Sequence, residues 1–299
     1  MTQPERRPHP LEIPPQPAPT RAPSASAAGP RFSLGNTPPY LTQAALALMV
    51  ALFILRAASP ELDQQIQQAG WNLPQAVFQE NQMYRLFTSI FLHAGIWVER
   101  WRGGFALAPI GALHLLFNAY MLYHFGGALE RILGHLRFAA IFTIGGLCAS
   151  ILSAVTGDPC IPSLGASGAV FALIGAQVIL LLRNRRLFGQ RGNHMLRQLL
   201  IWTLINFGIG IASTLPGSAL RIDNWAHFGG LVAGLALAAA LIPRYQFNVA
   251  AEESGWQVKL RPQAASAALN LIPAAVIAAF LLAFLWRAAT LPVVFCRFF

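Results

Sequence analysis

The sequence predicts an all-α fold, a polytopic bundle of helices that span a membrane. Of its 299 residues, 55% are hydrophobic and only 11% are charged, whereas an average soluble domain has about 25% charged residues. The mean hydropathy is +0.51. Seven separate segments approach the roughly 20 apolar residues that a helix needs to cross a hydrocarbon core about 30 Å thick. A soluble protein can bury one such helix, but seven with almost no polar face indicate a bilayer.

The seven apolar segments are expected to be the membrane spans. In chain order they are Tyr40–Leu55, Phe105–Leu129, Leu136–Val155, Gly165–Leu182, Leu196–Thr214, Trp225–Ile242 and Ala267–Trp286. The first six spans form the predicted core, residues 40–245, which includes a long first external loop at 57–104. Residues 246–266 are expected to be a cytoplasmic linker, and residues 267–299 hold the seventh span and a short external C-terminus. The segment 1–39, rich in Pro, Ala and Ser, is predicted to be a disordered cytoplasmic tail.

The distribution of arginines predicts how the chain is oriented in the membrane. Arginines gather in the N-terminal tail and in the loops that follow the second, fourth and sixth spans. Basic loops tend to stay on the cytoplasmic side, although long loops, such as the first external loop, follow this rule weakly. The N-terminus is therefore expected in the cytoplasm and the C-terminus outside, in a multi-pass protein of a bacterial inner membrane.

The charge and the cysteines argue against several partners. The net charge of +10 does not indicate nucleic acid, because the arginines cluster by loop beside the membrane. The three cysteines have no metal-binding spacing, and two intramembrane histidines without carboxylate or thiolate partners fall short of a usual zinc set. We therefore expect no metal and no cofactor. Cys160 and Cys296 both fall on the predicted outer side, so a disulfide between them could form, although the sequence alone does not require it.

Polar side chains at three places in the spans are candidates for function, because a bilayer tolerates them only where they face protein or water. They are His114 with Asn118 in the second span, Ser167 at the start of the fourth, and His227 near the start of the sixth. Each also has a plainer explanation. A serine among small residues commonly just allows close packing, and a histidine or asparagine can simply bond to a neighbouring helix.

Small residues around Ser167 and His227 predict that these two side chains meet. The fourth span opens with "GASG", in which Gly165 and Gly168 flank Ser167, and the sixth contains "AHFGGLVAG". The small residues that repeat every four positions and form stripes are Gly168, Ala172 and Ala176 in the fourth span and Gly230 and Gly234 in the sixth. If the two stripes pack together, Ser167 and His227 lie near the same, outer end of both helices. A neutral imidazole beside a hydroxyl is the arrangement that activates serine as a nucleophile.

Attack of Ser167 on a carbonyl would create an oxyanion, which needs hydrogen-bond donors already in place. His114 and Asn118 lie one turn apart on one face of the second span and could donate, together with the Ser167 N–H at a helix N-terminus. Asp223 precedes His227 by one turn, but helical side chains tilt toward the N-terminus, so we interpret it as an acid at the start of the helix. The expected constellation is a Ser–His dyad.

These residues together resemble the rhomboid family of intramembrane serine proteases. The resemblance rests on "HLLFN", "GASG" and "AHFGGLVAG" in the second, fourth and sixth spans, and it covers about residues 83–243. The segment "MYRLFTSIFLHAG" looks like the first-loop segment of the family, and "GGALERILG", with Glu130 and Arg131, looks like the end of its second helix. The resemblance implies a six-helix rhomboid-like core with a nucleophile at Ser167 and a general base at His227.

The resemblance also implies roles for the surrounding residues. His114 and Asn118 would support the oxyanion, and Gly165 and Gly168 would shape the entry into the fourth span. Phe171 occupies the place of a family aromatic residue, tyrosine in many members, that stacks on the catalytic imidazole.

Two parts of the chain depart from the simplest rhomboid pattern. Between His93 and His114 stands "AGIWVERWRGGFALAPIGAL", which is longer and more polar than the usual segment. The seventh span resembles that of members with an added C-terminal helix, and it is expected at the periphery of the core.

The function implied by the resemblance is that of an intramembrane serine endopeptidase, acting on transmembrane protein substrates within the lipid bilayer. The alternative is a catalytically inactive rhomboid-like protein that binds membrane proteins, a class with the same fold but without the dyad. A small-solute transporter is disfavoured, because it would need intramembrane carboxylates or broken helices in matched halves, and the third to sixth spans have neither.

Overall fold

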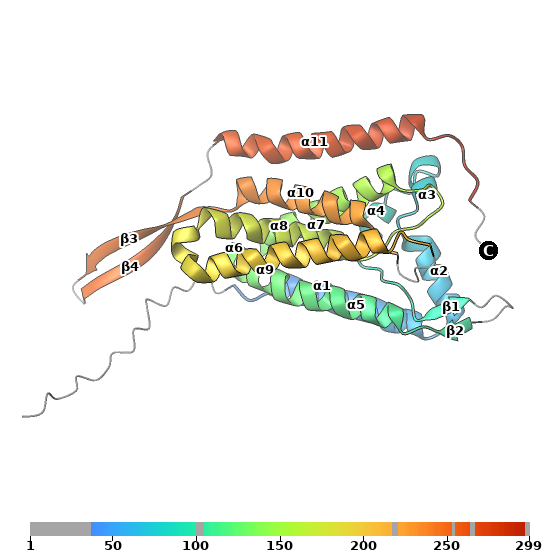
Figure 1. Ribbon diagram of the computed structural model, residues 1–299, viewed down its shortest axis with the longest axis horizontal. Helices are drawn as coiled ribbons and strands as arrows, with labels where there is room; N and C mark the ends of the chain where they lie inside the picture. The colour runs from blue at the N-terminus through green and yellow to red at the C-terminus, as the bar shows by residue number, and fades with distance from the viewer. Residues whose placement is uncertain (1–36, 100–104, 217–220, 253–254, 264–266, 297–299) are drawn as a thin grey trace, which may run out of the picture. The chain divides into compact units, whose positions relative to one another are not determined.

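The computed structural model describes residues 37–99, 105–216, 221–252, 255–263 and 267–296, which are mostly helical (Figure 1). Nearly all of the predicted N-terminal tail lies outside the described residues. Five of the described helices are long and apolar enough to cross a membrane: α1 (Tyr40–Ala57), α7 (His135–Thr156), α9 (Arg185–Ala212), α10 (Asn224–Leu241) and α11 (Ala267–Thr290). The predicted polytopic helical bundle is confirmed.

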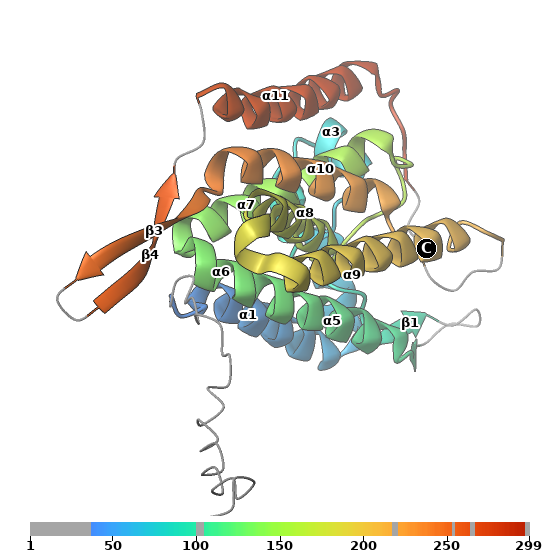
Figure 2. The same cartoon turned by 60° about the vertical axis from the view of Figure 1, so that its left-hand side comes forward.

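The second and fourth predicted spans correspond to helices that are shorter than these five. α5 (Ile110–Met121) continues through a π-helical turn, Leu122–Gly126, into α6 (Gly127–Leu133). α8 (Ser167–Arg183) has 17 residues and is buried along most of its length, with α7, α9 and α10 around it (Figure 2). α8 is therefore the central helix of the bundle.

The start of the second span differs from the prediction, which placed it at Phe105. Residues Phe105–Leu107 form strand β2, which pairs antiparallel with β1 (Trp97–Glu99), and α5 begins only at Ile110. Pro109 explains this boundary, because proline favours extended backbone in the residue before it and is well tolerated at the start of a helix. A short apolar run suits a strand as well as a helix, so hydropathy did not separate the two.

The first external loop folds into short helices gathered at one end of the bundle (Figure 1): α2 (Pro60–Gly70), α3 (Pro74–Gln79) and α4 (Arg85–Thr88). Ser59 caps α2, because its hydroxyl accepts a hydrogen bond from the Leu62 N–H at 3.1 Å. This cap and Pro60 at the first helical position fix where the loop turns back after α1.

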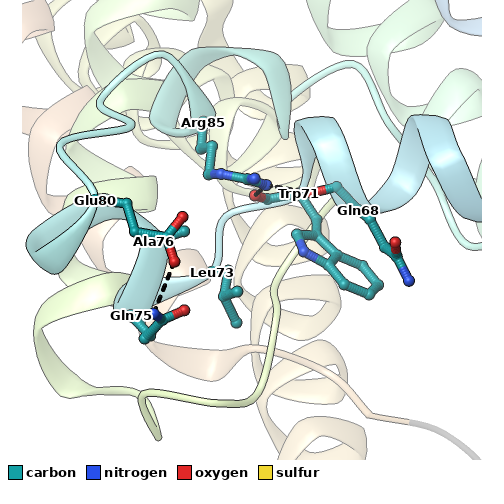
Figure 3. Close-up of a pocket in the computed structure, with 7 residues that line it drawn as sticks. All are labelled: Gln68, Trp71, Leu73, Gln75, Ala76, Glu80 and Arg85. Carbon is teal, nitrogen blue, oxygen red and sulfur yellow. Dashed lines mark hydrogen bonds between the residues drawn. The ribbon is translucent and has the colours of Figure 1, made fainter. Parts of the chain in front are cut away.

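Arg85 joins separate segments of this loop by hydrogen bonds. Its guanidinium donates to the carbonyl oxygens of Gln68 and Trp71, at 2.6 and 3.2 Å, and to the side chain of Gln82 at 2.6 Å. Figure 3 shows this side chain reaching across a shallow hollow from α4 toward the end of α2, with Glu80 on the other side. The loop therefore has an internal polar scaffold and is not a loose connection.

Helices α7, α8 and α10 approach to backbone contact. A Cβ atom added to Gly234 of α10 would lie 2.1 Å from the carbonyl oxygen of Ala172 in α8, and one added to Gly145 of α7 would lie 2.3 Å from the Ala172 Cβ. Apolar side chains gain little by leaving lipid for protein, so close packing through small residues is what holds membrane helices together. These three helices form the tightly packed centre of the molecule.

Glu130 of α6 caps α1 from another part of the chain. Its carboxylate is fully buried and accepts hydrogen bonds from the N–H groups of Leu41 and Thr42, at 2.9 and 2.8 Å, and from the Thr42 hydroxyl at 2.6 Å. Pro39, the N-cap residue of α1, provides no side-chain cap. Glu130 thus satisfies donors that the helix itself leaves without partners.

The far end of α8 is joined to the last turn of α10. Arg183 donates to the carbonyl oxygens of Ala239 and Ile242, which have no partners within a helix that ends there. Asn184 accepts a hydrogen bond from the Tyr245 N–H at 2.7 Å. Two strands follow, β3 (Arg244–Glu252) and β4 (Gly255–Gln263), so the segment predicted as a linker contains an antiparallel hairpin.

The last helix, α11, lies along α10 at the edge of the bundle (Figure 1). Phe280 of α11 is buried against the core, and the rings of Phe284 and Phe78 lie 4.8 Å apart. Beyond this helix, a disulfide joins Cys296 to Cys160, the pairing that the sequence left open. The C-terminal segment is therefore tied to the loop that leads into α8.

A thiol assay tests this disulfide. Maleimide-polyethylene glycol, added to the denatured but unreduced protein, should modify one cysteine per chain, Cys148, which is free. After reduction it should modify all three cysteines in the sequence. Three adducts before reduction would contradict the pairing of Cys160 with Cys296.

Replacing Glu130 by glutamine tests the cap on α1. The free energy of unfolding should fall by about 2 kcal/mol, because a buried charge-assisted acceptor of several donors is replaced by a weaker one. Thermal unfolding in detergent measures the loss. The matched control is Glu80→Gln at an exposed position, where the same chemical change should alter stability by less than about 0.5 kcal/mol. Equal effects at the two positions would contradict the capping role.

Candidate active site

Ser167 is the first residue of α8, and the backbone before it is held in an unusual conformation. Gly165 has φ of +125°, which side chains disfavour, and its N–H donates to the Ser89 carbonyl oxygen at 2.9 Å. Ala166 then serves as the N-cap of the helix. The Ser167 side chain is therefore presented, half-buried, at a helix N-terminus where backbone N–H groups lack helical partners.

His227 lies in the first turn of α10, and its ring packs on α8. The imidazole stacks on the ring of Phe171, with centroids 4.2 Å apart and planes inclined by 12°. Phe207 of α9 meets both rings edge-on. Because Phe171 is one turn after Ser167, the stack holds the buried imidazole beside the first turns of α8.

Helices α8 and α10 are in backbone contact where these two residues stand. A Cβ atom added to Gly230 would lie 2.0 Å from the Gly168 carbonyl oxygen, and one added to Gly168 would lie 3.4 Å from the Ala226 carbonyl oxygen. Gly168 follows Ser167 and Ala226 precedes His227, so both candidate residues lie at this contact. Among the described residues, no hydrogen bond joins the two side chains; such bonds are often long in enzymes without substrate.

Asp223 is engaged elsewhere and does not orient the imidazole. Its carboxylate accepts hydrogen bonds from the Ala226 N–H at 2.9 Å, from the Ser163 hydroxyl at 2.7 Å, and from the Ser153 hydroxyl. The interpretation of Asp223 as an acid at the start of the helix is confirmed. The same carboxylate ties α10 to α7 and to the loop before Ser167.

The structure brings His114 to this site and places Asn118 one turn further along α5. A Cβ atom added to Gly165 would lie 3.1 Å from both Cε1 and Nε2 of His114, so the imidazole lies directly against the entry to α8. Asn118 is buried, and its amide donates to the His114 carbonyl oxygen at 3.0 Å. A side-chain amide has two N–H groups, so a second donor remains.

His93, for which the sequence patterns predict no role, lies beside His114 in the structure. The two rings are 5.2 Å apart, and Nε2 of the buried His93 accepts from the Ala166 N–H at 3.5 Å. Burial, and then the neighbouring His114, lower the pKa of His93 to about 3, so the ring is neutral at neutral pH. In the sequence, the only sign of a role for His93 was that an ionisable residue stands in an apolar part of the first loop. Its partners could not be identified, because they are distant in sequence.

Comparisons with known proteins show which family this chain resembles. The Rhomboid domain model matches residues 105–244, which include every site residue predicted from the sequence but not His93. The Rhomboid protease GluP of Bacillus subtilis (strain 168) is 31% identical over 207 residues, 69% of this chain and 36% of GluP. RHOMBOID-like protein 7 of Arabidopsis thaliana is 34% identical over 186 residues, 62% of this chain and 50% of that protein. The Bacillus subtilis rhomboid YdcA is 33% identical over 168 residues, 56% of this chain and 70% of YdcA.

This chain belongs to the rhomboid family. The family and the apolar helices together make it an integral, multi-pass membrane protein. The chain spans no more than half the length of GluP and of RHOMBOID-like protein 7. Within this rhomboid, the segment between His93 and His114 contains β1 and β2.

Replacing Gly230 by alanine tests whether the contact between α8 and α10 is needed. The new methyl group meets backbone that cannot move aside, so the helices must separate, and stability should fall by about 1–3 kcal/mol. Thermal unfolding in detergent measures this. The matched control is Gly127→Ala in α6, where an added Cβ has no neighbour within 4 Å, and stability should stay the same or rise. A neutral Gly230→Ala variant would contradict the close contact.

Proposed function

We propose that this rhomboid is an intramembrane serine endopeptidase that hydrolyses peptide bonds in or near transmembrane segments through a dyad of Ser167 and His227. The observation that carries the proposal is the stack of His227 on Phe171, one turn from Ser167 and beside a backbone contact between α8 and α10. A histidine held in this way beside a serine at a helix N-terminus is suited to accept its proton.

The dyad would act in two stages. In the first, the Ser167 Oγ attacks the scissile carbonyl carbon while His227 takes the hydroxyl proton. The C–N bond then breaks, and His227 gives that proton to the leaving amine. In the second stage, a water molecule attacks the resulting ester with His227 again as the base, which releases the new carboxylate and restores Ser167. The reaction requires neither a metal nor a cofactor.

Donors at the start of α8 would stabilise the oxyanion. The Ser167 N–H has no helical partner at this position, and the His114 imidazole lies against Gly165 two residues earlier. Asn118, one turn along α5, would contribute its remaining amide N–H. One such donor is typically worth about 2.7–4 kcal/mol in the transition state. Gly165 and Gly168 keep bulky side chains away from the attacking oxygen.

The disulfide supports the proposed orientation in the membrane. Cys160 stands in the loop that enters α8, and disulfides persist in oxidising compartments such as the bacterial periplasm. We infer that the Ser167 end faces outward, with the N-terminus in the cytoplasm and the C-terminus external, in a bacterial inner membrane. Substrates would be transmembrane proteins whose helix unwinds near the outer leaflet, because an intact helix has its carbonyls hydrogen-bonded.

Substitution of the dyad tests the activity. In liposomes, cleavage of a reporter with a helix-destabilised transmembrane segment should fall at least about 10³-fold in Ser167→Ala and in His227→Ala. Fluorophosphonate labelling should also disappear in Ser167→Ala.

Two matched controls accompany this test. Ser150→Ala removes a buried serine from the neighbouring helix α7, and His194→Ala removes an exposed histidine from α9; both should retain cleavage. A fully active Ser167→Ala variant would defeat the dyad. A wild-type protein that binds the reporter without cleaving it would support the alternative, an inactive rhomboid-like binder of membrane proteins.

A further inference from the structure

A buried ion pair outside the dyad contacts the loop that supports His114. Arg56, in the last turn of α1, and Asp63, in α2, are each 2% exposed. The Arg56 Nε donates to the Asp63 Oδ1 at 2.7 Å, and the Arg56 Nη1 donates to the His93 carbonyl oxygen at 2.6 Å. A buried ion pair commonly stabilises a protein no more than apolar residues of similar volume. A contribution to stability therefore does not explain why an ion pair stands at this position.

The backbone at residues 93–95 is where this ion pair meets the candidate active site. Asp63 lies against Gly95, because a Cβ atom added there would be 2.0 Å from the Asp63 Oδ2. The first turn of α5 rests on the same stretch, since a Cβ atom on Gly111 would lie 2.0 Å from the Gly95 carbonyl oxygen. The ion pair therefore fixes the backbone on which the helix of His114 is seated.

One hydrogen bond from this stretch sets the protonation of His114. The Ala94 N–H donates to the His114 Nδ1 at 3.4 Å. In a neutral imidazole, one nitrogen accepts and the other carries the proton, so this bond leaves the proton on Nε2. The His114 Nε2 lies, together with Cε1, against Gly165 at the entry to α8. As a donor it can serve an oxyanion; in the other tautomer it would be an acceptor and would repel one.

We propose that the Arg56–Asp63 ion pair is a positioning element that holds Ala94 against His114 and so keeps the His114 proton on Nε2, where it can stabilise the oxyanion. Arg56 and Asp63 do not touch the substrate, and they act through the carbonyl of His93 and the N–H of Ala94. This inference rests on the proposed protease function for its effect on turnover, but not for its effect on the tautomer.

The kinetic test combines Asp63→Asn with His114→Ala. Asp63→Asn keeps the shape of the side chain, and it should lower kcat about 10–100-fold with little change in KM, because a displaced catalytic group costs turnover and not binding. In the His114→Ala background, Asp63→Asn should lower kcat by less than about twofold, since residues that act through one another are not additive. Equal losses in the two backgrounds would overturn the proposal.

A double variant with apolar residues tests whether the loss of kcat in Asp63→Asn is caused merely by misfolding. Arg56→Met with Asp63→Leu removes both buried charges and should fold, as judged by thermal unfolding in detergent. It lacks the bond to the His93 carbonyl, so its kcat should be as low as that of Asp63→Asn. Glu130→Gln is the matched control, a buried carboxylate at the other end of α1, and its folded fraction should keep the wild-type kcat. A folded double variant with wild-type kcat would also overturn the proposal.

The tautomer can be measured without any activity. In ¹⁵N NMR spectra of histidine-labelled protein, the signals lost in His114→Ala identify His114 among the seven histidines. The wild type should show an unprotonated Nδ1 and a protonated Nε2, and Asp63→Asn should populate both tautomers. A proton on Nδ1 in the wild type, or an unchanged tautomer in Asp63→Asn, contradicts the inference. Absent cleavage and absent labelling of Ser167 would instead contradict the proposed function.

Discussion

The contact between the Gly168 carbonyl oxygen and Gly230 sets the separation of α8 and α10. No methyl group fits between the two backbones there, so the helices are as close as backbones allow. In a bilayer, burial of apolar side chains gives little net attraction, and such contacts between small residues take over the role of a hydrophobic core. The position of the His227 ring on Phe171 is a consequence of that separation. The spacing of two helices thus determines whether a hydroxyl and an imidazole can share a proton.

Polar side chains with several hydrogen-bond partners fix the two ends of the bundle. At the end that carries Ser167, the carboxylate of Asp223 joins α10 to α7 and to the loop before α8, and Arg85 organises the first external loop. At the other end, Glu130 caps α1 and Arg183 binds the last turn of α10. Because each of these groups has hydrogen-bond partners on other elements, it specifies how the helix ends meet. Close packing along smooth helix faces does not by itself prevent one helix from shifting along another. The candidate active site is held by this combination of central packing and polar ends.

Much of the fold could be predicted from the sequence, because hydropathy reports directly on contact with lipid. The stripe of small residues that contains Gly230 could also be predicted from the sequence, because a repeat every four residues is a property of a single helix. The strand at Phe105, the role of His93 and the pairing of Arg56 with Asp63 could not be predicted in this way. Each depends on the path of a loop. That path is set by contacts with residues distant in sequence, which a local sequence pattern does not identify. The cap that Glu130 provides to α1 is of the same kind, as its two partners are 88 and 89 residues away.

The central claim is that Ser167 and His227 lie close enough to exchange a proton. The most direct measurement is an experimental structure of the protein in lipid, with a phosphonate bound covalently to the Ser167 Oγ. The account predicts an imidazole nitrogen of His227 within about 2.6–3.2 Å of that oxygen or of the adduct, with the ring still stacked on Phe171. Ser167 facing lipid, or His227 turned away across the bundle, would contradict it.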